Sequence, residues 1–226
     1  MTHVWKRRIG FLGLLCTFML FLLYGFEEHF LFYANLGAIC ILFSCWNQYD
    51  KRSPRLSELV LCACMITMAV AGRVLFLWAP GFKPLTGIAI IAGALLGGWN
   101  GFLCGSLSAL LSDLFFGIGP WTFFQMLAWG IIGLGAGFIH KCFKKRTIRI
   151  VYALFSGVFF SVFMDIYSTM ATGSFEFQRY IALLITSLPF MVIYMISNVL
   201  FVEILYPIMA RNDAPLNSVN LFESLR

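Results

Sequence analysis

Charged and amide side chains occur inside apolar stretches of this chain, where they are least expected. Ionisable groups are costly to bury in a lipid bilayer, so those found there commonly line a path or a site for a substrate or an ion. The strongly apolar stretch from residue 73 to residue 137 contains thirteen of the twenty glycines and, at its turns, four candidates of this kind. A fifth follows in a later apolar run, so the candidates for substrate binding are Arg73, Lys83, Asp113, Gln125 and Asp165.

A flat aromatic side chain accompanies these groups at the start of a predicted helix. Trp121, Gln125 and Trp129 follow one another at intervals of four residues, which places them on one face of a helix. Pro120 suits the first turn of that helix. The pattern is typical of a tryptophan belt at the membrane surface, with Gln125 bonded to a neighbouring helix. It also suits the mouth of a binding site, so Trp121 joins the candidates.

The charged candidates allow two interpretations. Arg73 can pair with Asp113 or with Asp165 in a structural ion pair inside the membrane. Alternatively, these groups and Lys83 line a pocket that opens to the outside and has charged and aromatic walls. Both interpretations place the polar groups at a similar depth.

Motifs for catalysis are absent from the sequence. The chain has no GxxxxGK[ST] phosphate loop, no HExxH and no GxSxG. The three histidines lie at the ends of segments, and the seven cysteines do not show metal-ligand spacing. One enzymatic hypothesis remains, in which Asp113 and Asp165 hold a metal ion within about 4 Å and act on a lipid. Otherwise we predict no catalytic residue, no metal and no cofactor.

Composition places the chain in a membrane. Of the 226 residues, 61% are hydrophobic and 12% are charged, and the mean hydropathy is +0.88. These values leave too little polar surface for a soluble domain of this size. The net charge of +6 does not indicate nucleic-acid binding, because the basic residues flank apolar runs instead of sharing one exposed face. We expect an all-α integral membrane protein in contact with the lipid bilayer.

Apolar runs of suitable length predict eight transmembrane helices. The fourth and fifth are short and are separated only by residues 97–101, so they form a tight hairpin or are miscounted. The chain divides into an N-terminal pair of helices (1–55), a six-helix core (56–210) and a polar tail (211–226). The predicted spans are 9–25, 30–46, 57–78, 84–99, 101–117, 120–140, 149–171 and 180–208.

Loop charge predicts the orientation of the helices. Lys and Arg accumulate in the cytoplasmic loops of membrane proteins. All of the sixteen basic residues except Arg73, Lys83 and Arg179 fall on alternate loops or at the termini. This distribution predicts that both termini lie in the cytoplasm and that the three exceptions lie at or near the outer face.

Small residues recur at spacings that allow helices to pack closely. Ala63, Thr67 and Ala71 form one such stripe on the third predicted span, which suits internal packing or docking of another membrane protein. The glycines with a spacing of four are Gly93, Gly97, Gly101 and Gly105, and also Gly133 and Gly137.

Three features carry a resemblance to a known family. They are Gly72-Arg73, the FKP of Phe82 to Pro84, and the run LLGGWNGFLCGSLSALLSDLFFGIGPWTFFQM. With these features, residues 57 to about 208 resemble the six-helix substrate-binding S component of an energy-coupling factor (ECF) type ABC importer. Such importers are the vitamin transporters of prokaryotes. The LSD, FFG, GPWT and FQM elements are most similar to those of cobalamin-type S components, whereas the N-terminal pair of helices departs from the family pattern.

The resemblance implies a subunit that captures a vitamin at the outside of a prokaryotic cell membrane. In that family a transmembrane T component and two cytoplasmic ATPases drive uptake, which fits the lack of a nucleotide motif here. The resemblance also implies that Ala63, Thr67 and Ala71 contact the T component, although Thr67 departs from the Ala-xxx-Ala-like pattern of the family.

The implied ligand is cobalamin or a precursor such as cobinamide. Its peripheral amides need hydrogen-bond partners such as Gln125, Asp113 or Lys83, and Trp121 can cover a ring face. Thiamine precursors, pyridoxine-type compounds and queuosine precursors are the alternatives within the family. Outside it, the alternatives are the lipid enzyme described above and a membrane scaffold without a sizeable cavity.

Overall fold

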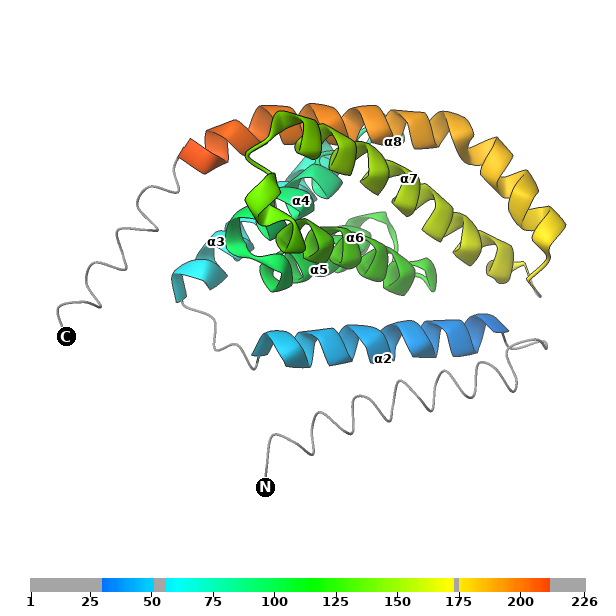
Figure 1. The fold of residues 1–226 in the computed structure, drawn as a ribbon. Coiled ribbons are helices and arrows are strands. Elements are labelled where there is room, and N and C mark those ends of the chain that lie inside the picture. Colours follow the sequence, from blue (N-terminus) through cyan, green and yellow to red (C-terminus); the bar gives the residue numbers. More distant parts are fainter. Residues whose placement is uncertain (1–29, 51–55, 173–174, 212–226) are drawn as a thin grey trace, which may run out of the picture.

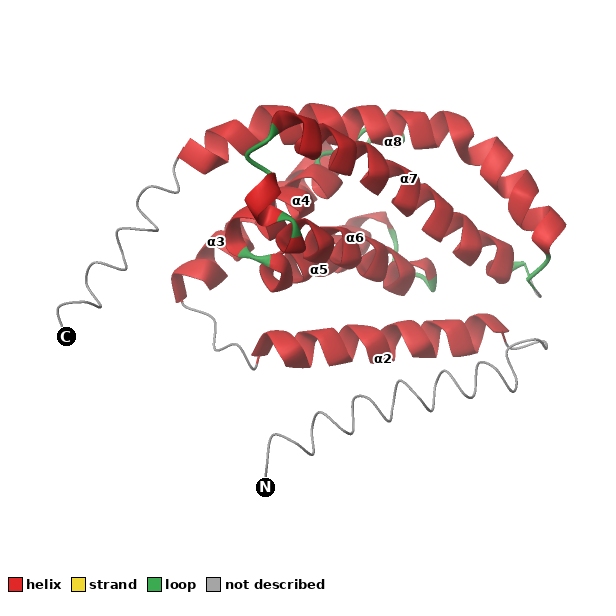
Figure 2. Cartoon of the chain, in the orientation of Figure 1, coloured by secondary structure: helices red, strands yellow, loops and turns green. Residues whose placement is uncertain are grey.

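The computed structural model describes residues 30–50, 56–172 and 175–211, and these residues form helices joined by short turns (Figures 1 and 2). The described part contains seven α-helices and one short 3-10 helix, without a β-strand. Their bounds are α2 Phe30–Asp50, α3 Leu56–Leu75, α4 Leu85–Leu96, α5 Gly98–Phe116, α6 Trp121–Phe138, η1 His140–Cys142, α7 Arg146–Ala171 and α8 Phe177–Arg211.

The seven α-helices follow the predicted order of spans. The first predicted span, residues 9–25, and the tail after residue 211 lie outside the described residues, so the count of eight helices remains a prediction. The span predicted over residues 84–99 is shorter than expected. Helix α4 has 12 residues, and at 1.5 Å per residue it is about 18 Å long, which is too short to cross a bilayer core.

Glycine explains why the helix ends early. Gly97 alone separates α4 from α5 and has a φ of +97°, a left-handed value that side-chain-bearing residues rarely adopt. The chain therefore reverses in a tight turn at this position, and the hairpin interpretation of residues 97–101 is confirmed. The early turn keeps α4 inside the bundle, where nine of its residues are buried.

Four helices of the described part are long and apolar enough to cross a membrane: α3, α6, α7 and the Phe177–Ala210 part of α8. Large apolar side chains are exposed on all of them, in the manner expected of lipid-facing surfaces. Helix α8 carries the longest row, with Ile181, Ile185, Leu188, Val192 and Ile196 exposed at intervals of three or four residues. The helices are therefore suited to a membrane location.

The core of the bundle forms where α4, α5 and α6 approach closely. Helix α5 packs most extensively on α6, and α7 packs on α8. A methyl group added at Gly101 or Gly133 would collide with the backbone carbonyl of the other residue. The glycine spacing predicted close packing, and this part of the prediction is confirmed.

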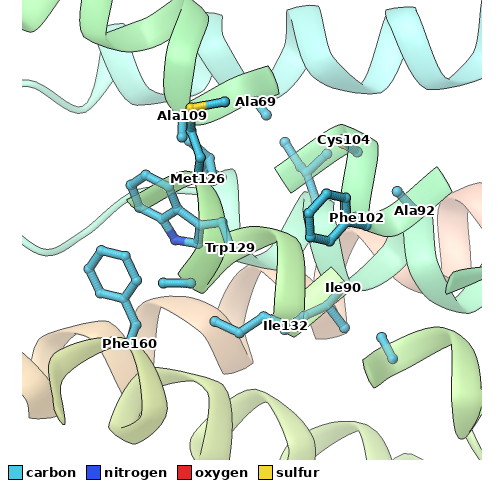
Figure 3. Close-up of a cluster of buried hydrophobic side chains, with 14 of the residues drawn as sticks. Ala69, Ile90, Ala92, Phe102, Cys104, Ala109, Met126, Trp129, Ile132 and Phe160 are labelled. Atoms are coloured by element: carbon cyan, nitrogen blue, oxygen red, sulfur yellow. The ribbon is translucent and has the colours of Figure 1, made fainter. Parts of the chain in front are cut away.

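A large aromatic residue fills the centre of the core. Trp129 of α6 is fully buried, together with Met126, Ile132 and residues of α4 and α5 (Figure 3). Its ring stacks on that of Phe160 in α7, with centroids 4.6 Å apart and an angle of 15° between the planes. Trp129 thus joins the α4–α6 part of the bundle to the α7–α8 pair.

Basic residues gather at one end of the bundle. The start of α3, the connection between α6 and α7, and the end of α8 lie at this end, and the connection between α7 and α8 lies at the other (Figure 1). Lys141, Lys144 and Lys145 are exposed here, while Arg146 and Arg149 both pair with Glu203 of α8. We call this the basic end. It is the end that loop charge predicts to face the cytoplasm.

Candidate functional site

Arg73, in the last turn of α3, is the centre of a buried polar cluster. Its side chain is 8% exposed, and its Nη1 lies 2.7 Å from Oδ1 of Asp113 in α5. The same nitrogen donates to the hydroxyl of Ser112, and Nη2 donates to Oε1 of Gln125 in α6 at 3.3 Å. Side chains of α5 and α6 therefore hold the guanidinium group of α3, and of the two carboxylates considered for Arg73, Asp113 is its partner.

Asp113 is fully buried, and both of its carboxylate oxygens have donors. While Oδ1 accepts from Arg73, Oδ2 accepts from the hydroxyl of Thr122 at 2.7 Å. The Thr122 hydroxyl in turn accepts from the backbone N–H of Gly119 at 3.2 Å. This chain of bonds ties the turn between α5 and α6 to the ion pair, so Asp113 fixes the position of Arg73 from inside the bundle.

Aromatic rings surround the guanidinium group. Its Cζ lies 4.7 Å from the ring centroid of Phe116 and 5.2 Å from that of Trp129. Cations at these distances are attracted by the ring quadrupole. The indole of Trp129 is held in place, because its Nε1 donates to the buried hydroxyl of Thr86 in α4 at 3.0 Å.

Lys83 reaches the same indole from the loop between α3 and α4. Its Nζ lies 5.9 Å from the ring centroid of Trp129 and 5.3 Å from that of Tyr194 in α8. The main chain of Lys83 is fixed, because its N–H donates to the Ser197 hydroxyl at 2.9 Å and its carbonyl accepts from that hydroxyl at 3.1 Å. Two cationic side chains thus meet at one tryptophan.

Two predicted site residues lie apart from this cluster. Asp165 in α7 is 8% exposed and accepts a hydrogen bond from the Ser187 hydroxyl of α8 at 2.6 Å. Asp113 and Asp165 share no hydrogen-bond partner among the described residues, and no group of three or more metal-ligating side chains occurs there. Trp121 is 39% exposed, and its ring packs against Gly119 instead of facing Arg73.

Comparison with known families gives one match. Residues 53–216 match DUF6580, a family of unknown function. The chain belongs to the DUF6580 family. No curated protein and no solved structure matches the chain. The DUF6580 match includes all of α3 to α8 and therefore every residue of the Arg73 cluster, whereas α2 lies outside it.

Several members of the cluster in this DUF6580 chain were not among the sequence candidates. Ser112 precedes Asp113 in the sequence, and Thr122 lies at the start of α6. Polar residues so close in sequence to a buried charge could have identified both as members of the cluster. Tyr194 and Ser197 lie more than a hundred residues from Lys83, so only the packing of α8 brings them to it. Trp129 was noted for its spacing but was not counted as a site residue.

The stripe predicted to bind a T component lies on an open surface of α3. Ala63, Thr67 and Ala71 are all exposed. The Thr67 hydroxyl donates to the carbonyl of Ala63 at 3.0 Å, so it turns back onto its own helix. Thr67 therefore presents its methyl group outward between the two alanines, and the stripe is smooth and apolar.

The chemistry of the Arg73 cluster is recognition of polar or charged groups. It contains two cations, Arg73 and Lys83, and one carboxylate, Asp113, with aromatic faces beside the cations. The Nζ of Lys83 and the amide nitrogen of Gln125 make no hydrogen bond within the described residues. Both residues are partly exposed, which makes these two donors candidates for binding a further molecule.

Proposed function

We propose that this DUF6580 protein is a membrane subunit that binds a small molecule, in the manner of the S component of an ECF-type importer. The observation that carries the proposal is the Arg73 cluster. A buried cation of α3 is held by side chains of α5 and α6, while two donor groups beside it, Nζ of Lys83 and the amide nitrogen of Gln125, make no hydrogen bond within the described residues. Polar groups arranged in this way within apolar helices typically mark a site for a substrate.

The proposed ligand is cobalamin or a corrinoid precursor such as cobinamide. The peripheral amide carbonyls of a corrinoid accept hydrogen bonds, which suits the free donors of Lys83 and Gln125. Asp113 has both oxygens occupied, so its proposed role is to hold Arg73 in place. Since Trp129 is fully buried, the partly exposed Trp121 is the tryptophan suited to cover a ring face. Thiamine precursors, pyridoxine-type compounds and queuosine precursors are the alternative ligands.

The proposal includes partners and a location. A subunit without a nucleotide motif needs others to drive transport, so a T component and two cytoplasmic ATPases are proposed partners. The exposed stripe of Ala63, Thr67 and Ala71 suits close contact with a helix of the T component. The proposed location is the prokaryotic cell membrane, with the basic end and both termini in the cytoplasm.

The test is ligand binding by the purified full-length protein in lipid nanodiscs, without ATP. Isothermal titration calorimetry with cobalamin, cobinamide, thiamine and pyridoxine should show saturable binding of at least one compound. Saturation by a compound other than a corrinoid would replace the proposed ligand and leave the class intact. Absence of binding across a broad panel of vitamins and precursors would contradict the proposal.

The partner is tested separately by co-purification. Thr67→Leu places a larger side chain on the stripe and should weaken recovery of a T component co-expressed with the protein. Thr147→Leu, an exposed position at the basic end, is the matched control. Because the Thr67 side chain is exposed, ligand binding should be unchanged; equal recovery of the T component by both variants would remove the stripe from the proposed interface.

A further inference from the structure

Lys83 carries a positive charge that no carboxylate of the described residues balances. Each carboxylate whose side chain is described has another partner. Glu58 accepts from Asn100, Asp113 pairs with Arg73, Asp165 accepts from Ser187, Glu176 pairs with Arg179, and Glu203 pairs with Arg146 and Arg149. The cluster formed by Arg73, Lys83 and Asp113 therefore has a net charge of +1.

The environment of Lys83 makes this surplus charge significant. The side chain is partly buried, and its Nζ lies over the rings of Trp129 and Tyr194. A charge removed from water needs a partner, and aromatic faces replace only part of the lost hydration. The Ser197 hydroxyl bonds the N–H and the carbonyl of Lys83, so the main chain from which the ammonium group extends is fixed beside these rings.

The neighbouring guanidinium group increases the preference for an anion. Arg73 lies over the same indole as Lys83, and its Asp113 partner is bonded on the inner side by Thr122. An incoming anion would experience the uncompensated ammonium group of Lys83, with the Gln125 amide as a further donor. A neutral ligand would leave the ammonium group of Lys83 without a counterion.

We infer that the ligand of this site carries an anionic group, a carboxylate or a phosphate, attached to an apolar or aromatic body. The anion binds Nζ of Lys83, and the body lies against the ring of Tyr194. The inference rests on the proposed function, because it names the chemical class of ligand for the same site; of the two proposed corrinoids it selects cobalamin, which carries a phosphodiester, over cobinamide, which does not. Anionic lipids share this chemistry, and the experiment below separates them from soluble ligands.

The experiment compares pairs of compounds that differ in one anionic group. Suitable pairs are pyridoxal 5′-phosphate with pyridoxal, thiamine monophosphate with thiamine, nicotinate with nicotinamide, and biotin with biotin amide. Dissociation constants are measured for the full-length protein in phosphatidylcholine nanodiscs. The anionic member of at least one pair should bind at least about tenfold tighter, which corresponds to one charge-assisted hydrogen bond.

Variants of Lys83 connect this preference to its charge. Lys83→Met keeps most of the apolar stem and should remove the preference, whereas Lys83→Arg should retain most of it. Lys144→Met, an exposed lysine at the basic end, is the control and should bind like the wild type. Because Ser197 bonds only the main chain of residue 83, the Met variant should fold, and Lys83→Gln provides a second neutral side chain if it does not.

Four results would overturn the inference. If neutral members bind as tightly as anionic ones, or if Lys83→Met keeps the preference, the ligand is not recognised by its charge, while the proposed function stands. If Lys83→Met changes only the retention of phosphatidylglycerol, counted by native mass spectrometry, the residue binds lipid. If no compound of any pair or of the wider panel binds, the proposed function fails and the inference fails with it.

Discussion

The bundle contains two arginine–carboxylate pairs that have similar contacts but different surroundings. At the basic end, Arg149 and Glu203 join α7 to α8, and the guanidinium group also donates to the carbonyls of Phe143 and Lys144. In the Arg73 cluster, Arg73 and Asp113 join α3 to α5. Both guanidinium groups also lie near an aromatic ring, at 4.8 Å for Arg149 over Tyr206 and 4.7 Å for Arg73 over Phe116.

The difference lies in where the surplus positive charge is placed. At the basic end the surplus belongs to Arg146, whose side chain is 76% exposed and therefore hydrated. In the Arg73 cluster the surplus belongs to Lys83, which is partly buried against aromatic rings. A hydrated surplus charge needs no partner, whereas a partly buried one does. The comparison therefore supports a structural role for the ion pairs of the basic end, and it is consistent with our proposal that the Arg73 cluster binds a ligand.

The largest effect should follow from removing the carboxylate of the buried pair. Asp113→Leu leaves the Arg73 guanidinium group buried without its counterion and should destabilise the protein by about 3–5 kcal/mol. The double variant Arg73→Met with Asp113→Leu removes both charges and should recover much of that loss. Thermal unfolding of the purified variants in the same detergent measures both changes. A double variant no more stable than the single one would mean that the ion pair does not couple these positions.

Loss of the hydrogen bond between Thr86 and Trp129 should have an intermediate effect on stability. Thr86→Val removes the acceptor of the buried Trp129 N–H and should destabilise the protein by about 1–3 kcal/mol, the cost of a buried unsatisfied donor. Thr86→Ser keeps the hydroxyl and is the control for that bond. Ligand affinity should fall in the Val variant, since Trp129 positions both Arg73 and Lys83. Unfolding curves and ligand titrations that do not distinguish Val from Ser would show that the bond does not hold the indole.

The smallest effect on stability should follow from a substitution at the basic end. Glu203→Gln removes a carboxylate that is 17% exposed but leaves an amide oxygen that can accept from Arg149, so it should lower stability by about 1 kcal/mol. Ligand binding should be unchanged, because Glu203 lies at the end opposite the predicted outer face. Thermal unfolding and calorimetry on one sample give both quantities. A loss of affinity as large as that of Thr86→Val would break the distinction between the two regions.

The sequence predicted the helical architecture because apolar runs, glycine spacing and loop charge are local patterns. The repeated glycines of α5 and α6 anticipated the contact between Gly101 and Gly133. The length of α4 was overestimated, because the left-handed backbone at Gly97 ends the helix within an apolar run. A hydropathy profile does not reveal such a turn, because the residues on both sides of it are apolar.

For the Arg73 cluster, the sequence predicted most of the charged and amide residues but only part of their spatial arrangement. Spacing placed Trp121, Gln125 and Trp129 on one face, yet at 100° per residue the two tryptophans diverge by about 80° over eight residues. This divergence lets Trp129 enter the core while Trp121 stays at the surface. The choice of Asp113 over Asp165 as the partner of Arg73 depends on which helices pack together. That is a tertiary property, and no local pattern specifies it.

We propose that the Arg73 cluster binds a soluble small molecule and that the basic end does not. The most direct measurement is calorimetric titration, with the compound that binds the wild type, of the Arg73→Met and Asp113→Leu double variant and of Glu203→Gln. The double variant should fold but lose saturable binding, and Glu203→Gln should retain the wild-type dissociation constant. Wild-type affinity in the folded double variant would contradict the claim.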